Sequence, residues 1–368
     1  MVHDVWVEVD LSALRHNLQQ IRSAVAENVA IMAVVKGNGF GHGYVEPARA
    51  FLDAGADALA VTRLEEALII RKAGITTPIL LFAPIQPDNA EIAIDADLEM
   101  TVASIPLVQA ISKAAIKLGQ TAKIHVKVDT GMGRLGLSPN DVAGFFEAIE
   151  SVPGIIVAGI FTHFATAADA NIEACREQYR CFDSVLQNLR RSGIDYGKSH
   201  AANSAAILRL PETHLDMVRP GTLLYGQYPS QSVPRIDLKP TWQLKARICE
   251  IRQISKGLDI SYGAEYTTKR NTTTAVIPIG YADGFTLAPE GPVYRQSVIK
   301  FLAKKIKRSL NVDINGRKVQ VIGRVAMQMA VLDVTNVPDI KVGDEVIVPA
   351  MRIPTSPLIP RIYLESFI

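Results

Sequence analysis

Cysteine is scarce in this sequence. Only Cys175, Cys181 and Cys249 occur, an odd number without C-x-x-C spacing. This pattern argues against a disulfide framework and against a structural zinc site, so we expect no metal. Few, unpaired thiols suit a reducing compartment, and we expect a cytoplasmic protein.

Long apolar runs are also missing. No segment approaches about 18 uninterrupted apolar residues, the length that predicts a membrane span. Residues 1–10 alternate charged with apolar side chains and contain neither the basic nor the apolar region of a signal peptide. We therefore expect no membrane partner.

Neither sign of charge dominates. The chain carries 39 lysines and arginines against 37 acidic residues, a net charge of +2, whereas nucleic-acid binders usually show a clear basic excess. One basic run, Lys300–Arg308, is interpreted as a solvated helix face or an insertion, with an anion or partner site as the alternative. With 368 residues, 48% of them hydrophobic, the chain is expected to form two globular domains.

Eight short apolar runs recur in the first part of the sequence. They are continuous rather than alternating, as expected for strands covered on both faces. The runs are Ala30–Val35, Ala58–Val61, Pro78–Phe82, Leu98–Val102, Ile124–Val128, Ile155–Phe161, Gly197–Ala201 and Asp216–Arg219. Helical patterns lie between them, at Ser12–Ala24, Arg63–Ala73, Ile105–Leu118, Pro139–Ser151 and Ile172–Ser192. Strands alternating with helices in this number predict a (β/α)8 barrel of the TIM type, with a doubly wound open sheet as the alternative.

The pattern changes near Leu238-Lys239-Pro240. Beyond it, alternating segments separated by turn signals predict a second, mostly β domain. These segments are Trp242–Ile254, Thr273–Ile279, Val319–Val325, Met329–Val334 and Asp344–Val348. We place the barrel at 1–236 and the β domain at 237–368, with residues 1–10 able to pack with the second domain.

Active sites of such barrels lie at the carboxyl ends of the strands. The first strand ends in Lys36, which is followed by the glycine-rich stretch Gly37–Gly43. A lysine after a buried strand must be paired, solvated or kept neutral, and a lysine with a lowered pKa can bond covalently to an aldehyde cofactor. A lysine in an ordinary surface loop is the alternative.

The next conspicuous strand ends are the fifth and the sixth. The fifth strand contains Lys127 and leads to Arg134, which stands between glycines. A guanidinium in that setting can bind an anion with a planar pair of donors. The sixth strand ends at His163, which is either a functional imidazole or a packed one.

The last two strands lead to a candidate phosphate site. Loops after strands 7 and 8 usually bind phosphate in this barrel. Ser204 follows the seventh strand, and Arg219, Gly221 and Thr222 mark the end of the eighth. A phosphate-bearing cofactor is therefore expected there, although Ser204 could instead cap a helix.

Taken together, the motifs resemble those of the alanine racemase family. Five stand in the family's order: Ala33–Lys36 with Gly41–Gly43, Lys127–Arg134, Arg219–Gly221, Ser261–Gly263 and Gly280–Gly284. The resemblance covers nearly the whole chain. It implies a homodimeric isomerase with a barrel and a β domain, which uses pyridoxal 5'-phosphate to interconvert L- and D-alanine and so supports D-alanine biosynthesis.

The resemblance implies two bases. Lys36 would hold the cofactor and act on one face of the substrate Cα. Tyr262 would act on the opposite face, in the barrel of the partner subunit, since a phenol near a cation can serve as a base. Two bases are needed because one base alone tends to return the proton to the face it left.

The resemblance also assigns the residues around these bases. Arg219 would bond the pyridine nitrogen and, because a guanidinium stays protonated, would give it no proton. His163 would link Arg219 to Tyr262. Lys127, carbamylated in this family, would orient Arg134 toward the cofactor's phenolic oxygen and the substrate carboxylate. Phosphate and substrate contacts would come from Ser204, Gly221, Thr222, Tyr281 and the backbone of Met327.

Some positions depart from the family pattern. Phe40 and Pro357 stand where tyrosines would bond the phosphate, and Ala326 and Gln328 stand where cysteine and aspartate are typical. Each lost hydroxyl donor to a charged group weakens binding by about 1.5–3 kcal/mol. Gln328 removes a negative charge near the substrate carboxylate, which leaves a broader substrate range open.

Two further functions remain open. A pyridoxal-phosphate-binding protein without turnover would suit a single-domain barrel, but the β domain and Tyr262 argue against it. A basic amino-acid decarboxylase sharing the barrel would need a catalytic cysteine in the second domain. The one cysteine there, Cys249, lies inside a predicted strand.

Overall fold

The chain forms two compact units in a computed structural model that describes residues 2–286 and 310–367. One unit is Asp10–Thr241, and the other combines Met1–Val9 with Trp242–Ile368. The division follows Thr241 rather than residue 236, and the N-terminal strand groups with the C-terminal unit. The basic run 300–308 lies outside the described residues. Among those that are described, no helix is both long and apolar enough to span a membrane.

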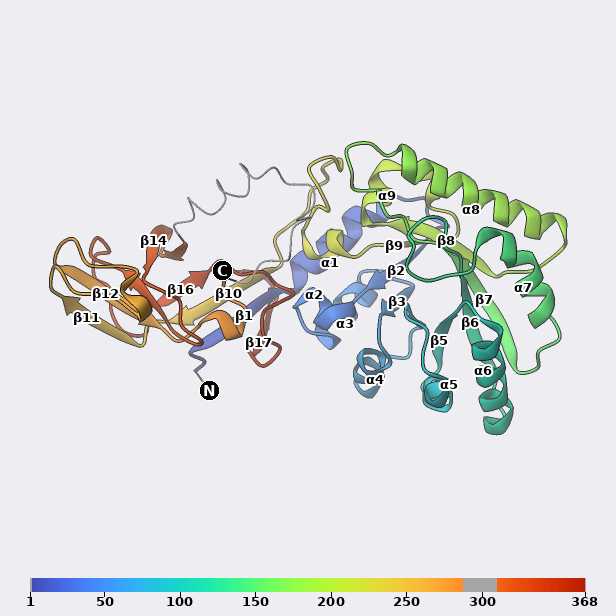
Figure 1. Ribbon diagram of the computed structural model, residues 1–368, viewed down its shortest axis with the longest axis horizontal. Helices are drawn as coiled ribbons and strands as arrows, with labels where there is room; N and C mark the ends of the chain where they lie inside the picture. The colour runs from blue at the N-terminus through green and yellow to red at the C-terminus, as the bar shows by residue number, and fades with distance from the viewer. Residues whose placement is uncertain (1, 287–309, 368) are drawn as a thin grey trace. The chain divides into compact units, whose positions relative to one another are not determined.

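The barrel unit is a closed barrel of eight parallel strands (Figure 1). Neighbouring strands pair in chain order, and the last strand pairs back with the first, so the open-sheet alternative is wrong. The strands are β2 (Ala30–Val34), β3 (Ala58–Val61), β4 (Ile79–Leu81), β5 (Leu98–Val102), β6 (Ala122–Lys127), β7 (Ile155–Phe161), β8 (Lys198–Asn203) and β9 (Met217–Arg219). All eight expected strands are present, which confirms the predicted fold class.

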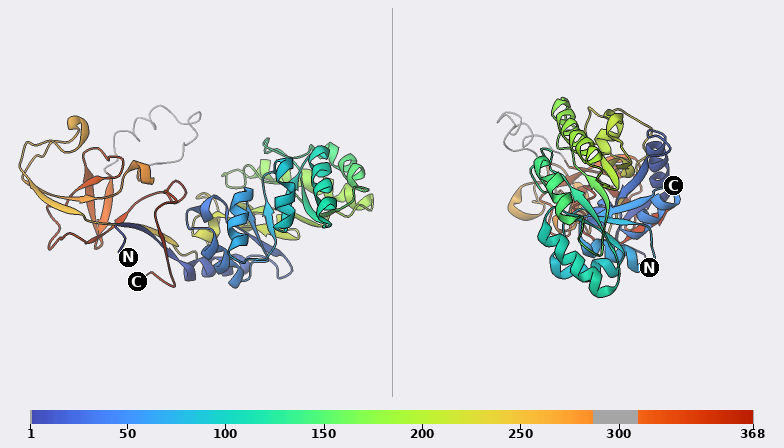
Figure 2. Two further views of the ribbon diagram at one scale, coloured as in Figure 1. Left: turned by 90° about the horizontal axis from the view of Figure 1, so that it is seen from below. Right: turned by 90° about the vertical axis from the view of Figure 1, so that its right-hand side faces the viewer.

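Helices cover the outside of these strands, as the views in Figures 1 and 2 show. The helical segments are α1 (Leu11–Arg22), α2 (Lys36–Phe40), α3 (Val45–Asp53), α4 (Leu64–Lys72), α5 (Ala90–Asp95), α6 (Ile105–Leu118), α7 (Val142–Ile149), α8 (Glu173–Arg191) and α9 (Ser204–Arg209). Of these, α2 is a left-handed turn after β2 and not a right-handed helix. The short segments α2, α3, α5 and α9 were not predicted. The expected helix Pro139–Ser151 begins as a separate 3-10 turn, Pro139–Asp141, before α7.

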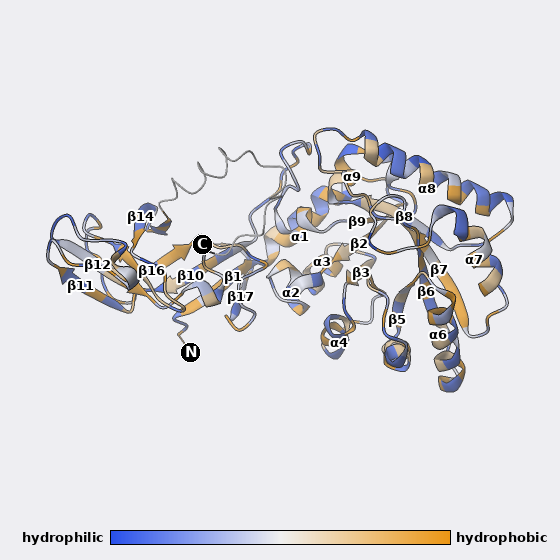
Figure 3. Cartoon of the chain, viewed as in Figure 1, coloured by the Kyte–Doolittle hydropathy of each residue, from blue (hydrophilic) through white to orange (hydrophobic). Residues whose placement is uncertain are grey.

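The packing of α8 explains why periodicity predicted most of these helices. Its apolar side chains Phe182, Leu186 and Leu189 are fully buried. Hydrophilic residues occupy most of the remaining positions, so that α8 alternates the two colours along its length in Figure 3. The start of helix α1 is also encoded locally. Asp10 is its N-cap, and the Asp10 carboxylate accepts a hydrogen bond from the Ala13 N–H (2.8 Å).

The second unit is a nine-stranded sheet with the order β11-β12-β15-β14-β13-β16-β10-β1-β17. Its strands are β1 (Val5–Asp10), β10 (Trp242–Arg247), β11 (Glu250–Ile254), β12 (Thr272–Ile277), β13 (Asn311–Ile314), β14 (Arg317–Ile322), β15 (Ala330–Asp333), β16 (Glu345–Val348) and β17 (Arg361–Leu364). The prediction of one strand over Trp242–Ile254 is wrong. Strand β10 pairs with β1 and β16, whereas β11 pairs with β12 at the far edge. Cys249 lies between these two strands, not inside one.

Candidate active site

Five basic side chains meet at the carboxyl ends of the barrel strands. Lys36 follows β2, Lys127 ends β6, Arg134 lies in the next loop, His163 follows β7 and Arg219 ends β9. All five line one cavity of about 250 Å³. The barrel therefore gathers these predicted residues. The positive charge of the two arginines favours an anionic ligand.

A left-handed turn fixes Lys36 at the mouth of the barrel. Gly37, Asn38 and Gly39 have φ values of 62°, 56° and 56°, a region that glycine enters without strain. The Lys36 side chain remains exposed at the open mouth. Desolvation of its ammonium by the surrounding protein, followed by the charge of Arg134, lowers the pKa of Lys36.

The buried carboxylate of Glu66 holds this turn in place. Its Oε1 accepts hydrogen bonds from the Gly37 N–H (2.8 Å) and the Tyr44 hydroxyl (3.1 Å). Its Oε2 accepts from the backbone N–H groups of Thr62 (2.8 Å) and Arg63 (3.1 Å). Glu66 thus joins the loops after β2 and β3, and its charge partly restores the pKa of Lys36.

Lys127 is buried at the end of β6 with 3% of its surface exposed. Its Nζ donates to the Val128 carbonyl (2.5 Å) and lies 5.4 Å from the centre of the Phe161 ring. Burial, and then the charge of Arg219, lower the pKa of Lys127 to about 7. A neutral amine is therefore well populated near neutral pH, and that is the form which reacts with carbon dioxide.

Arg134 lies in a tight loop that leaves β6 and returns beside it. The Asp129 carboxylate accepts from the backbone of Gly131 (3.0 Å), Met132 (2.8 Å) and Gly133 (3.1 Å). At the return, a Cβ on Gly136 would lie 2.6 Å from the Asp129 nitrogen. The loop can close this tightly only because position 136 has no side chain.

Arg219 is as deeply buried as Lys127, with 3% of its surface exposed. Its Nη1 donates to His200 Nδ1 (2.9 Å), and its Nη2 donates to the carbonyls of Thr162 (2.7 Å) and Ala201 (3.0 Å). Burial lowers the pKa of Arg219 to about 9. Three N–H groups are used in these bonds, which leaves two without a partner among the described residues.

His163 lines the cavity beside Arg219. Burial, and then the charge of Arg219, lower the pKa of His163 to about 3, so this imidazole is neutral. The imidazole that bonds Arg219 directly is His200, a residue to which the sequence analysis assigned no role.

The predicted phosphate residues line a second cavity of about 290 Å³, which shares Lys36, His163 and Arg219 with the first. Ser204, Gly221 and Thr222 all border it. The Ser204 Oγ accepts from the Gly221 N–H (2.8 Å). The cap of α9 is Asn203, whose side chain accepts from Ala205 and Ala206, so Ser204 is not the helix cap.

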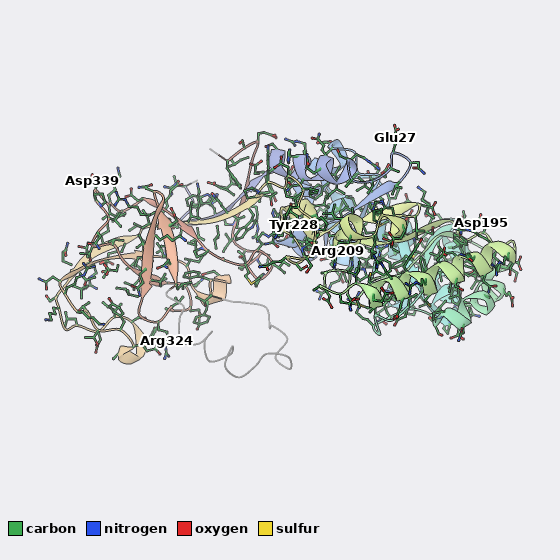
Figure 4. All side chains as sticks on the ribbon, turned by 90° about the horizontal axis from the view of Figure 1, so that it is seen from above. Glu27, Asp195, Arg209, Tyr228, Arg324 and Asp339 are labelled. Atoms are coloured by element: carbon green, nitrogen blue, oxygen red, sulfur yellow. The ribbon has the colours of Figure 1, made fainter. Side chains whose placement is uncertain are left out.

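Arg209 supports the wall of this second cavity and was not predicted from the sequence. Its guanidinium (labelled in Figure 4) donates to the carbonyls of Ala167 (2.8 Å), Asp169 and Ala170 (3.2 Å). Ala167 lines the cavity. Arg209 thus fixes the loop after β7 by its backbone, a role that leaves no motif in the sequence.

Tyr262 lies in the β unit, in the 3-10 turn η5 (Tyr262–Ala264), with 68% of its surface exposed. Ser261 before it has a φ of 66°, and its hydroxyl donates to the Arg324 carbonyl (2.6 Å). The Arg324 guanidinium (labelled in Figure 4) forms an ion pair with Glu265 just after the turn. These contacts hold the tyrosine on a defined loop with its side chain accessible.

Tyr281 and Met327 lie on two adjoining loops of the same unit. The Tyr281 N–H donates to the Ala326 carbonyl (3.2 Å). A Cβ on Gly280 would lie 2.1 Å from that carbonyl oxygen, so glycine is required where the loops touch. Tyr281 and Met327 are 46% and 59% exposed, respectively.

Other residues that line or support the site were missed for a common reason. His125, His200 and Glu99 are polar residues inside barrel strands, and Glu66 is a carboxylate on a helical segment. For Glu99 and His125 the available signal was a polar side chain interrupting an apolar run, whereas His200 lies in a strand that is itself largely polar. These positions became informative only once the barrel placed β5, β6 and β8 around a common interior.

Comparisons with known proteins agree with this architecture. Residues 9–229 match the family described as "Alanine racemase, N-terminal domain", and residues 241–356 match "Alanine racemase, C-terminal domain". An alanine racemase from Desulforamulus reducens is 43% identical over 354 residues, covering 95% of this chain and 90% of the relative. One from Methanococcus maripaludis is 42% identical over 349 residues, covering 94% and 89%.

Solved structures give the same result. The structure of an alanine racemase from Clostridium difficile 630 superposes with a TM-score of 0.91 at 34% identity, covering 99% of this chain and 96% of that one. The Bacillus anthracis alanine racemase with bound L-Ala-P superposes with a TM-score of 0.87 at 32% identity, with the same coverage.

Proposed function

This chain belongs to the alanine racemase family, and on that premise we propose that it interconverts L- and D-alanine with pyridoxal 5'-phosphate and two bases, Lys36 and Tyr262. The observation that carries this assignment is the convergence of Lys36, Lys127, Arg134, His163 and Arg219 on one cavity. We further propose a cytoplasmic homodimer. Its three cysteines form no disulfides, which suits a reducing compartment.

The residues present fit the cofactor. Gly221 lines the phosphate-side cavity, and a Cβ there would lie 3.1 Å from the Phe40 ring, so glycine relieves a tight contact at this wall. The hydroxyls of Ser204 and Thr222 border the same space. The two unused N–H groups of Arg219 are suited to an acceptor such as a ring nitrogen.

Phe40 gives this phosphate site a smaller set of donors. Its ring stacks on Tyr225 at 4.8 Å between centres, and the Tyr225 hydroxyl is occupied by the Val34 carbonyl (3.1 Å). Phosphate binding in this protein thus relies on Ser204, Thr222 and backbone N–H groups. The positive charge of Lys36 and Arg219, which line the same cavity, adds to that binding.

Bound pyridoxal phosphate would withdraw electrons from the Cα of an amino acid and make its proton acidic. Lys36 has a lowered pKa, so its amine is better able to accept that proton near neutral pH than an ordinary lysine. Tyr262 would exchange a proton on the opposite face, with its phenol supplied by the partner subunit. Arg134 would hold the substrate carboxylate, and Arg219 would donate a hydrogen bond to the ring nitrogen without losing its proton.

The test is Cα–H exchange in deuterated water. Purified protein with added pyridoxal phosphate is given L-alanine or D-alanine, and deuteration is followed by proton NMR. We expect both enantiomers to exchange with the wild type. Tyr262→Phe should slow exchange from one enantiomer by roughly 10²-fold or more while cofactor absorbance is retained.

The matched control is Tyr266→Phe, which changes a second tyrosine in the same loop region and should behave as wild type. Equal and unimpaired exchange from both enantiomers in Tyr262→Phe would exclude the two-base assignment. A panel of serine, lysine and larger amino acids tests the substrate range that Gln328 leaves open. Cofactor binding without exchange from any amino acid would indicate a carrier instead of an enzyme.

A further inference from the structure

Arg219 stands at one end of a line of hydrogen bonds that crosses the inside of the barrel. Its Nη1 donates to His200 Nδ1 (2.9 Å), and His200 Nε2 lies 2.9 Å from His125 Nδ1. His125 Nε2 in turn lies 2.9 Å from Glu99 Oε2. The line therefore runs from the carboxyl end of β9, through β8 and β6, to Glu99 near the amino end of β5.

The two ends of this line fix the proton on each histidine between them. Arginine can only donate, so His200 Nδ1 must accept, and a neutral His200 then carries its proton on Nε2. His125 Nδ1 accepts that proton's hydrogen bond, so His125 carries its own proton on Nε2. An ionised carboxylate only accepts, and Glu99 is the matching end for the His125 Nε2–H. Any other arrangement places two donors or two acceptors face to face.

The local structure makes room for this arrangement. A Cβ on Gly159 of β7 would lie 2.6 Å from His125 Nδ1, so glycine at this position is what allows the imidazole to lie there. The register between β6 and β7 shifts between Ile124 and His125. The His200 ring stacks on Phe161 at 4.9 Å with 5° between the planes, which fixes its orientation.

The charges along the line need each other. No carboxylate among the described residues forms an ion pair with the buried Arg219, and Glu99 is the carboxylate that reaches it through hydrogen bonds. Burial is the largest single influence and acts to raise the pKa of Glu99, but the hydrogen bond with His125 and the nearby positive charge together outweigh it and hold the pKa below its ordinary value. Burial and the charge of Arg219 keep the pKa of His200 well below its ordinary value, so this imidazole stays neutral.

We propose that Glu99 is a positioning residue for Arg219, acting through His125 and His200. Its carboxylate fixes the order of protons along the line and balances the buried guanidinium. Arg219 is thereby held with its two remaining N–H groups available to the cavity. The consequence for catalysis rests on the proposed function, in which Arg219 donates to the ring nitrogen of pyridoxal phosphate.

The first test reads the proton order without cofactor or substrate. The seven histidines of the chain are labelled with ¹⁵N, and the His125 and His200 resonances are assigned by substitution. We expect both rings of the wild-type apoprotein to be neutral and protonated on Nε2. A proton on Nδ1 of either ring would overturn the proposal, whatever reaction the protein catalyses.

The second test compares Glu99→Gln with Glu91→Gln, an exposed glutamate on α5 that pairs with Lys117. Glu99→Gln should shift the His125 Nε2 proton upfield, accelerate its exchange with water and disturb the His200 resonances. With cofactor and alanine, its turnover should fall roughly tenfold or more. Effects of this size are typical when a hydrogen-bonding partner of a residue that contacts the cofactor is removed. KM should change less than about twofold, because the carboxylate contact belongs to Arg134.

Glu91→Gln should match the wild type in every measurement. Glu99→Asp keeps the charge, and we expect it to restore the His200 resonances and part of the turnover if it folds. Wild-type histidine spectra together with wild-type turnover in Glu99→Gln would refute the proposal. A protein that catalyses no racemisation but shows the expected spectra would refute the proposed function and leave the hydrogen-bond line supported.

Discussion

Burial lowers the pKa of two cations in this site, with a different consequence for each residue. Lys127 and Arg219 are both almost completely buried, but they respond differently because their chemistry differs. The pKa of Lys127 falls to about 7, so the amine is often neutral, whereas that of Arg219 falls to about 9 and the guanidinium stays protonated. The site therefore contains both a reactive amine, Lys127, and a permanent cation, Arg219, which line the same cavity.

The buried amine of Lys127 should lower stability at neutral and acidic pH. Its folded-state pKa of about 7 lies below its ordinary value of 10.5, so the unfolded chain binds the proton more tightly. The resulting destabilisation is complete below pH 7 and disappears above about pH 10.5. Lys127→Met removes the charge while keeping a similar shape. We expect its free energy of unfolding to exceed that of the wild type by up to about 4 kcal/mol at pH 6.

Urea unfolding of the apoprotein between pH 6 and 10, in buffers free of carbon dioxide, measures this difference. The advantage of Lys127→Met should shrink steadily as pH rises from 7 to 10. Arg219 is common to both proteins, so its own titration cancels in the comparison. A difference that stays constant across this range would show that Lys127 is not the titrating group.

At the scale of elements, the Arg134 loop depends on one glycine more than on its neighbours. Gly136 has a φ of +126° and closes against the backbone of Asp129, whereas Gly133, with a φ of +67°, has nothing within 4 Å of its ideal Cβ. Gly136→Ala should therefore distort the loop and lower kcat/KM for alanine roughly tenfold or more, because misplacing a binding group is costly.

Gly133→Ala provides the matched control for that substitution. It adds the same methyl group to the same loop at the cost of about 1 kcal/mol of backbone strain. Steady-state kinetics and thermal unfolding of both variants separate a catalytic effect from a loss of stability. Similar kinetics for the two variants would show that the close approach at Gly136 does not position Arg134.

The elements also show what the sequence could predict. Most of the barrel strands were found because they are largely apolar runs, and Lys36, Arg134 and Arg219 were found because they end or follow such runs. Helix α5, with residues 90–95, is too short to show a clear period. Strands β10 and β11 were merged because their alternation continues through Ile248 and Cys249, and only pairing at opposite parts of the sheet separates them.

The supporting residues of the site were beyond prediction for a different reason. Glu99 and His125 are separated by 26 residues, and His125 and His200 by 75. Their relation depends on barrel closure and on the register shift at His125, which no local pattern encodes. Arg209 donates hydrogen bonds to backbone carbonyls, which every residue has. The side chains of the loop that it binds therefore give no signal of the contact.

At the scale of the whole molecule, the proposed homodimer makes each active site from two chains. Mixing two inactive variants tests this directly. In a mixed dimer of Lys36→Ala and Tyr262→Phe, one site would hold both substitutions and the other would be intact. Random exchange of subunits should then restore about a quarter of wild-type activity.

Each variant alone, taken through the same dissociation and reassociation, is the control and should stay inactive. The recovered activity should also depend on protein concentration, because it requires association. If Tyr262 served the barrel of its own chain, the mixture would remain as inactive as its components. The experiment therefore separates the two arrangements without a structure of the dimer.

The division of the chain has a consequence for synthesis on the ribosome. Strand β1 belongs to the β unit, but its partner β10 lies beyond the whole barrel, and Val9 pairs with Trp242 while the Asp10 N–H donates to the Thr241 carbonyl. At about 5–20 residues per second, the ribosome needs roughly 10–50 s to deliver that partner. The barrel can fold during this interval, whereas β1 emerges first and is paired among the last. Because of this order of synthesis, β1 pairs with β10 late, and the β unit completes its folding only after the barrel has left the exit tunnel.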